Sequence, residues 1–254
     1  MDEISFLATL AMIFVLAGTV KGVIGMGLPT VSLALVTVSA DLKTAMAMLI
    51  VPSAATNLWQ ALRGPGTLRV LESTWPFLLS AVSLIYVGIL LLDQINLTFL
   101  SGLLGVLLIA YALTSLAGFT LPEAVGQKHG YGIVAGAVNG VLTGMTGSFV
   151  VPGVIYLQSL ALNRDHFIKA MGMIFLVSTI ALAISLDRVS LLTPRHWQLS
   201  ALSIVPAVAG MWIGQRIRHR LSDSTFRRTF FLSLLVLGAY ITSHAATDWL
   251  AAAE

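Results

Sequence analysis

The chain has 254 residues, of which 57% are hydrophobic and only 10% charged; its formal net charge is +3 and it has no cysteine. Because soluble domains are about one quarter charged, this composition excludes an ordinary water-soluble protein and predicts an integral membrane protein held in a lipid bilayer. The lack of cysteine excludes disulfides, thiolate metal sites and thiol redox chemistry. Without a soluble segment of any size, the basic residues belong to membrane topology and indicate no nucleic-acid partner.

Seven apolar runs follow one another along the chain, at about residues 4–20, 42–62, 74–92, 97–118, 165–186, 197–214 and 229–247. Each approaches or reaches the roughly 20 residues that a helix needs to cross about 30 Å of hydrocarbon. A transmembrane β-barrel would need alternating polar and apolar residues over strands of roughly ten residues, and runs such as LLGVLLIAYAL at 103–113 do not alternate. The sequence therefore predicts an all-α integral membrane fold.

Two segments differ from simple spans, residues 4–38 and 130–162, because glycines and a proline interrupt each of them. LAGTVKGVIGMGLPTVSLAL in the first and VAGAVNGVLTGMTGSFVVPGVIYL in the second share AGxVxGV, then a proline and an apolar run, and an Ala-Met pattern follows both. The shared order predicts an internal repeat, with chance similarity of two Gly/Ala-rich segments as the alternative. The predicted division is an N-terminal repeat at 1–118, a linker at 119–129 and a C-terminal repeat at 130–254.

Each repeat then holds one broken segment followed by three transmembrane helices. If a broken segment enters the membrane and returns, as a re-entrant hairpin or a pair of short helices, it leaves the side unchanged, and three spans invert the second repeat. Loop charge agrees with this inverted arrangement and places both termini outside the cytoplasm. The basic residues placed on the cytoplasmic side are Arg63, Arg69, Lys128, Arg164, Lys169, Arg216, Arg218, Arg220, Arg227 and Arg228; those left outside are Lys43, Arg188 and Arg195.

The residues around the two breaks suit a bound anion. Glycines let the backbone turn so that successive N–H groups point one way, and a proline suits the first turn of a restarting helix. The start of such a helix offers unpaired N–H donors and the positive end of its dipole, and nearby hydroxyl groups add donors. Alternatively, the small residues only allow close helix packing. The candidate substrate-binding residues are Gly22, Gly25, Gly27, Pro29 and Thr30 at the first break, and Gly140, Thr143, Gly144, Thr146, Gly147, Ser148 and Pro152 at the second.

Lys21 is the only charged residue well inside an apolar run. In the repeat it aligns with Asn139, about ten residues into its own segment and hence roughly 15 Å deep, near the middle of the bilayer. A lysine at that depth is costly unless it faces water or a partner, so we predict that Lys21 and Asn139 bind the substrate. The alternative for Lys21 is snorkelling to the interface or hydrogen bonding to carbonyls of the break.

A polar stripe runs along the 42–62 span, because Ser53, Thr56, Asn57 and Gln60 are three or four residues apart and so share one helix face. Such a stripe rarely faces lipid. It lines the substrate path, with Asn57 and Gln60 as binding residues, or it joins two helices. The five histidines lie toward helix ends and loops without metal-ligand spacing, so we expect no metal and no cofactor.

With these breaks and their repeat, the chain resembles the TauE/SafE family of sulfite and organosulfonate exporters over essentially its whole length. The motifs that carry the resemblance are KGVIGMGLPTVSLAL and GAVNGVLTGMTGSFVVPGVIYL. Many members have three successive glycines before the proline, where this chain reads GMGLP and GSFVVP. The resemblance implies transport of sulfite, sulfoacetate or a related organosulfonate across a bacterial inner membrane, and no enzyme activity. A relay along membrane cysteines, as in the thiosulfate-uptake branch, is excluded because this chain has none.

The predicted function is export of a small sulfur-containing anion through a midplane site where the two breaks meet. Import of a sulfur oxyanion and a non-transporting membrane scaffold are alternatives. A third is an intramembrane hydrolase, because Thr146-Gly147-Ser148 resembles the glycine-flanked serine of membrane proteases; the histidines lie too near the helix ends to serve as its base, which leaves only Lys21. No aspartate or glutamate lies within a span, so export would follow the membrane potential rather than a coupled ion. The sequence does not indicate an oligomeric state.

Overall fold

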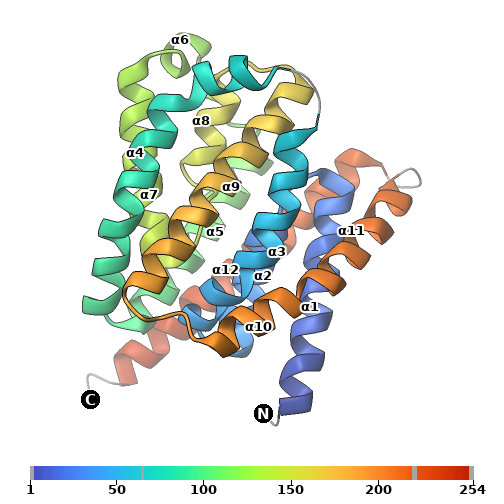
Figure 1. Cartoon of the computed structure of the whole chain (residues 1–254), viewed down its shortest axis with the longest axis vertical. Helices are drawn as coiled ribbons and strands as arrows, with labels where there is room; N and C mark the ends of the chain where they lie inside the picture. The colour runs from blue at the N-terminus through green and yellow to red at the C-terminus, as the bar shows by residue number, and fades with distance from the viewer. Residues whose placement is uncertain (1–2, 64–65, 219–221, 252–254) are drawn as a thin grey trace. The chain divides into compact units, whose positions relative to one another are not determined.

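The computed structural model describes residues 3–63, 66–218 and 222–251, and every regular element in these ranges is a helix (Figure 1). Arg220, one of the basic residues placed in the cytoplasm, lies outside the described residues. The helices are α1 (Glu3–Ile24), α2 (Leu28–Ser39), α3 (Leu42–Leu62), α4 (Thr67–Gln94), α5 (Leu97–Leu116), α6 (Glu123–Gly126), α7 (His129–Thr146), α8 (Gly153–Ser159), α9 (Arg164–Arg188), α10 (Pro194–Leu202), α11 (Ile204–Arg218) and α12 (Asp223–Ala251).

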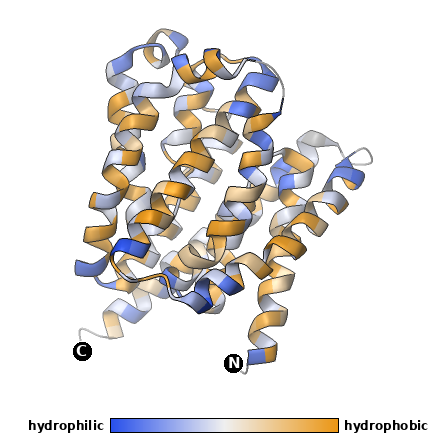
Figure 2. Ribbon diagram, viewed as in Figure 1, coloured by the Kyte–Doolittle hydropathy of each residue, from blue (hydrophilic) through white to orange (hydrophobic). Residues whose placement is uncertain are grey.

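Seven helical stretches of the described chain are long and apolar enough to cross a membrane: α1, α3, α4, α5, α9, α10 with α11, and α12. They coincide with the seven predicted apolar runs. Many large apolar side chains point outward, such as Leu79, Val205 and Val236, which are 64%, 71% and 70% exposed. Figure 2 shows apolar residues along the helices and hydrophilic ones mainly toward their ends. Exposed apolar surface of this extent suits lipid and not water, which confirms the all-α integral membrane fold.

Both predicted breaks are present. The first separates α1 from α2, with Gly25 and Gly27 at φ values of +81° and +104°. The second separates α7 from α8, and Gly147 at its start has a φ of +72°. These left-handed conformations favour glycine, since a side chain there would clash with the backbone. The α1 helix has 22 residues and is long enough to cross a membrane by itself, whereas α2 has 12 residues. The first break therefore follows a full-length helix, and α2 packs against α1.

The chain forms two compact units, each of which draws helices from both predicted repeats. Unit 1 contains residues 1–52, 96–116 and 192–254, and unit 2 contains residues 53–95 and 117–191. In unit 1, α1 packs along α11 and α5 along α12; in unit 2, α4 packs along α7 (Figure 1). The broken segment of each predicted repeat thus packs against the second full span of the other repeat. The repeats at 1–118 and 130–254 remain a prediction about the sequence and are not the compact units.

Glycines make the tightest of these helix contacts possible. In unit 1, a Cβ atom on Gly18 would lie 2.1 Å from the Ala207 carbonyl oxygen, and one on Gly22 would lie 2.3 Å from that of Met211. In unit 2, a Cβ atom on Gly140 would lie 2.3 Å from the Ala81 carbonyl oxygen. Only glycine fits such distances, as in the small-residue interfaces of other membrane helices.

Candidate functional site

The break of unit 1 combines a buried cationic residue with the start of a helix. Lys21 is 4% exposed and lies in the last turn of α1, and its carbonyl oxygen accepts a hydrogen bond from the Gly25 N–H at 2.8 Å. Lys21 is three residues before the end of α1 at Ile24, and its depth in the bilayer stays a prediction. Beyond the break, α2 has Pro29 in its first turn, and its N-cap, Gly27, has no side chain to bond the first amides. A basic residue before the break and uncapped amides after it both suit an anion.

Side chains from α5 and α12 enclose this break. The Tyr111 hydroxyl of α5 donates a hydrogen bond to the Met26 sulfur at 3.1 Å. The Tyr111 ring packs edge-on against Phe231 of α12, with 5.2 Å between the ring centroids. A Cβ atom on Gly27 would lie 3.2 Å from Cζ of Phe230. At this break Gly27 is buried, whereas Gly25 and Met26 are half-buried, and no atom lies within 4 Å of a Cβ atom built on Gly25. Non-helical backbone at membrane depth is tolerated where it is buried in protein or lines a cavity.

The break of unit 2 is held together by its own polar side chains. The Asn139 side-chain oxygen Oδ1 accepts a hydrogen bond from the Gly153 N–H at 3.0 Å, and its side-chain nitrogen Nδ2 donates to the Thr143 hydroxyl at 3.4 Å. Thr143 in turn donates to the Ser148 carbonyl oxygen at 2.9 Å. These bonds link the end of α7 to the start of α8 across the break, so Asn139 and Thr143 satisfy backbone groups that helix geometry leaves unpaired.

One buried hydroxyl in this break makes no hydrogen bond. The Ser148 side chain is 2% exposed, and its Oγ has no hydrogen-bond partner. By contrast, the Thr146 hydroxyl donates to the Leu142 carbonyl oxygen at 2.7 Å. A buried polar group without a partner costs about 1–3 kcal/mol, and such groups call for a specific explanation. Ser148 is therefore the side chain of the second break best placed to donate to a ligand.

The polar stripe of α3 lies against α9 in unit 2. Ser53 and Thr179 have their hydroxyl oxygens 3.3 Å apart, and the Asn57 amide donates to the Ser53 hydroxyl at 3.0 Å. A Cβ atom on Gly172 of α9 would lie 3.0 Å from the Gln60 carbonyl carbon. These contacts fit the alternative that the stripe joins two helices.

The predicted site residues divide between the two units, and their role as a binding site stays a prediction. Among the glycines, Gly25, Gly27 and Gly147 turn the backbone, whereas Gly22, Gly140 and Gly144 pack against the backbone of α11 or α4. Unit 1 holds Lys21, Gly22, Gly25, Gly27, Pro29 and Thr30; unit 2 holds Asn57, Gln60, Asn139, Gly140, Thr143, Gly144, Thr146, Gly147, Ser148 and Pro152.

A second buried lysine escaped the sequence analysis. Lys169, in the second turn of α9, is 2% exposed and donates a hydrogen bond to the Thr67 hydroxyl at 2.7 Å. The sequence assigns it to a cytoplasmic helix end, because Arg164 and His166 precede it closely. Only its partner at the start of α4, about a hundred residues earlier, reveals that it is buried, so no local signal could have found it.

Apolar spanning helices and two glycine-containing breaks between helices define a multi-pass helical membrane protein. A family profile described as Sulfite exporter TauE/SafE matches residues 10–241. The chain belongs to this family, whose members are transporters of sulfite or related sulfur anions and not enzymes. This confirms the resemblance seen in the sequence. Neither curated proteins nor solved structures gave a match.

Proposed function

We propose that the protein exports a small sulfur-containing anion, namely sulfite, sulfoacetate or a related organosulfonate, across a bacterial inner membrane. The observation that carries the proposal is the burial of Lys21 in the last turn of α1, before the break that leads to the uncapped start of α2. A buried ammonium group and a helix dipole both favour negative charge, and an ionisable residue at membrane depth marks a substrate path more often than a structural contact.

The two breaks have different roles in this proposal. The break of unit 1 supplies positive charge through Lys21 and through the first amides of α2. The break of unit 2 supplies a neutral donor, Ser148. Asn139 and Thr143 stabilise the backbone of this break through their hydrogen bonds. An oxyanion has several acceptor oxygens, and either kind of donor can bind one of them.

The buried side chains support movement driven by the membrane potential. Among the described residues, the buried charged side chains are Lys21 and Lys169, and none is an aspartate or glutamate. Proton-coupled carriers commonly use a buried carboxylate. An inside-negative potential already drives an anion outward, with about 2.3 kcal/mol per charge per 100 mV. Export of this kind needs no coupling residue.

Flux in proteoliposomes tests the proposal, with the potential and the pH gradient set independently. We expect release of ³⁵S-labelled sulfite or sulfoacetate that follows the potential when there is no pH gradient. Transport that requires a proton or sodium gradient and ignores the potential would exclude a uniporter. Net accumulation against the potential would favour import of a sulfur oxyanion, and no flux of any of these anions would contradict the proposal as a whole.

A further inference from the structure

Two cavities lie at opposite ends of the α5–α12 pair in unit 1. The two helices run antiparallel, and Gly105 near the middle of α5 packs against Gly238 and Thr242 of α12. A cavity of about 600 Å³ lies at the end of α5 and the start of α12, and one of about 310 Å³ lies at the start of α5 and the end of α12. Because α5 has 20 residues and rises 1.5 Å per residue, its ends are about 30 Å apart, the thickness of the hydrocarbon core.

The larger cavity, which we call the arginine cavity, is cationic. Its described lining includes two arginines and two serines and no carboxylate: Ser115, Leu116, Ser224, Arg227, Arg228, Phe231 and Leu232. Both arginines are exposed, so their guanidinium groups are accessible to a ligand from solution. A guanidinium group can hold an oxyanion through two parallel hydrogen bonds.

The arginine cavity is linked to the break of unit 1 by a short series of contacts. The Arg227 guanidinium lies 5.7 Å from the centroid of the Phe231 ring. Phe231 packs against Tyr111, whose hydroxyl donates to Met26 within the break. The arginine cavity and the break of unit 1 are therefore joined through Phe231 and Tyr111.

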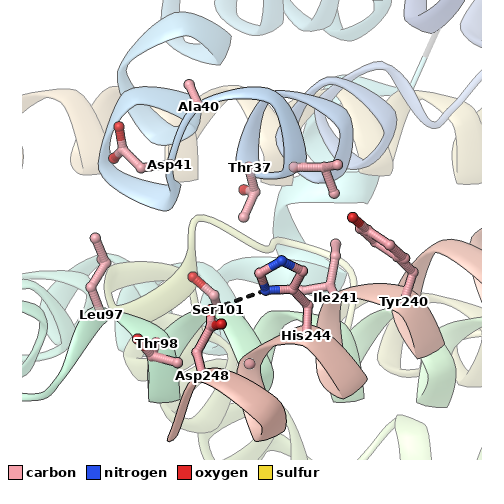
Figure 3. A pocket seen from close by; sticks show the side chains of 12 residues that line it. Thr37, Ala40, Asp41, Leu97, Thr98, Ser101, Tyr240, Ile241, His244 and Asp248 are labelled. Carbon is pink, nitrogen blue, oxygen red and sulfur yellow. Dashed lines mark hydrogen bonds and ion pairs between the residues drawn. The ribbon is translucent and has the colours of Figure 1, made fainter. Parts of the chain in front are cut away.

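The smaller cavity, which we call the aspartate cavity, has the opposite charge. Side chains of α2 and of the turn before α3 lie across it from those of α5 and α12 (Figure 3). It contains Asp41, Asp248 and His244, and its described lining includes no lysine or arginine. His244 Nδ1 lies within hydrogen-bond distance of the Asp248 carboxylate, at 3.0 Å, and Asp41 accepts a hydrogen bond from the Thr44 N–H at 2.9 Å. Carboxylates at this end repel an anion.

We propose that the arginine cavity is a binding site that collects small oxyanions for transport, and that the aspartate cavity disfavours their return from the other end. Together the charges of the two cavities favour movement of an anion through unit 1 from the arginine end to the aspartate end. The inference rests on the proposed function, since it assumes that the cargo is an anion. If the basic loops face the cytoplasm, this direction is export.

Uptake of ³⁵S-labelled sulfite into inside-out and right-side-out membrane vesicles tests the site. We expect R227Q/R228Q to raise the KM about tenfold at low salt in the vesicles that expose the arginine end, because surface charge of this kind raises the local concentration of the ligand. The effect should vanish between about 0.01 M and about 1 M salt, as the screening length falls from about 30 to about 3 Å. In the opposite vesicles, D41N/D248N should lower the KM.

R216Q/R218Q is the matched control. It removes two positive charges from the same predicted cytoplasmic region, but neither residue lines the arginine cavity. We expect its KM to equal that of the unchanged protein. If R227Q/R228Q and R216Q/R218Q change the KM equally, or if neither changes it, the inference is overturned. Measurable flux in the same experiment would leave the proposed function standing. R227K/R228K keeps the positive charge, so its KM should lie between that of the unchanged protein and that of R227Q/R228Q. This second variant keeps the test decisive if R227Q/R228Q fails to fold. No flux of sulfite, sulfoacetate or a related organosulfonate in the unchanged protein would overturn the proposed function, and the inference with it.

Discussion

Lys21 and Lys169 are both buried lysines, but their surroundings indicate different roles. Lys21 lies beside a break, whereas Lys169 joins α9 to α4 through Thr67. We predict that K21Q reduces anion transport per folded molecule at least tenfold, because hydrogen bonds to charged groups are worth about 1.5–3 kcal/mol and 1.4 kcal/mol is a factor of ten. The measurement is initial flux in proteoliposomes, normalised to folded protein.

K169Q serves as the control for this prediction. It also removes a buried positive charge, but we expect it to lower the melting temperature in detergent and to leave transport per folded molecule unchanged. Equal flux from K21Q and the unchanged protein would show that Lys21 has a purely structural role, such as stabilising the C-terminal end of α1.

Ser148 can be tested by chemical labelling, because the chain contains no cysteine and S148C would be its only thiol. We predict that a small anionic thiol reagent such as a sulfonatoethyl methanethiosulfonate modifies S148C from at least one side of the membrane, and that sulfite slows the modification. T74C is the control, since the Thr74 hydroxyl is fully buried and donates to the Val70 carbonyl oxygen within α4. Labelling of T74C but not S148C would place Ser148 away from the substrate path.

Single residues show where sequence reasoning reaches its limit. Gly25, Gly27 and Gly147 could be predicted as turning points, because glycine and proline interrupt a helix locally. The bonds of Asn139 could not, since they depend on Gly153, which is brought close only when the chain folds back at the break. The same polar residue types hydrogen-bond the backbone at a break and bind ligands. Only their hydrogen-bond partners in the folded protein distinguish the two roles.

Among the elements, the α4–α7 pair makes a direct prediction about stability. G140A should destabilise the protein by about 1–3 kcal/mol, the usual cost of overpacking, because its Cβ atom would lie 2.3 Å from the Ala81 carbonyl oxygen. G130A in the same helix should be neutral or slightly stabilising, since no atom lies within 4 Å of its added Cβ and alanine favours helix. Thermal unfolding in detergent measures both, and equal melting temperatures would contradict the tight contact.

Helix bounds were largely predictable, but helix partners were not. Hydrophobic length alone identified the spans, because the bilayer requires about 20 apolar residues. The pairing of α1 with α11 depends on Gly18 and Gly22 of α1 and on Gly210 and Gly214 of α11, each of which packs against the backbone of the other helix. These glycines are far apart in the sequence, and glycine pairs of this spacing recur elsewhere in the chain, so the spacing alone does not select a partner.

For the whole molecule, the predicted topology puts loops of like charge on the same side, and one cavity of unit 2 agrees with it. Arg69 and Lys128, both assigned to the cytoplasmic side, line that cavity. We therefore predict that reporter fusions at residues 68 and 222 report the cytoplasm and a fusion at residue 190 the periplasm. A periplasmic reading at residue 222 would overturn the assignment and the inverted repeat with it.

The packing of α1 against α11 also determines the order in which the protein can be completed in the cell. In the sequence, both segments of unit 2 come before residues 192–254 of unit 1, and α5 of unit 1 separates them. Unit 2 can therefore fold while the ribosome is still making residues 192–254. Gly18 must wait for Ala207 and Met211, and at about 5–20 residues per second the intervening chain takes roughly 10–40 s to synthesise. During that time the glycine face of α1 lies against lipid or against a temporary partner. A chaperone or insertase that covers this face would act on the nascent chain and be released when α11 arrives.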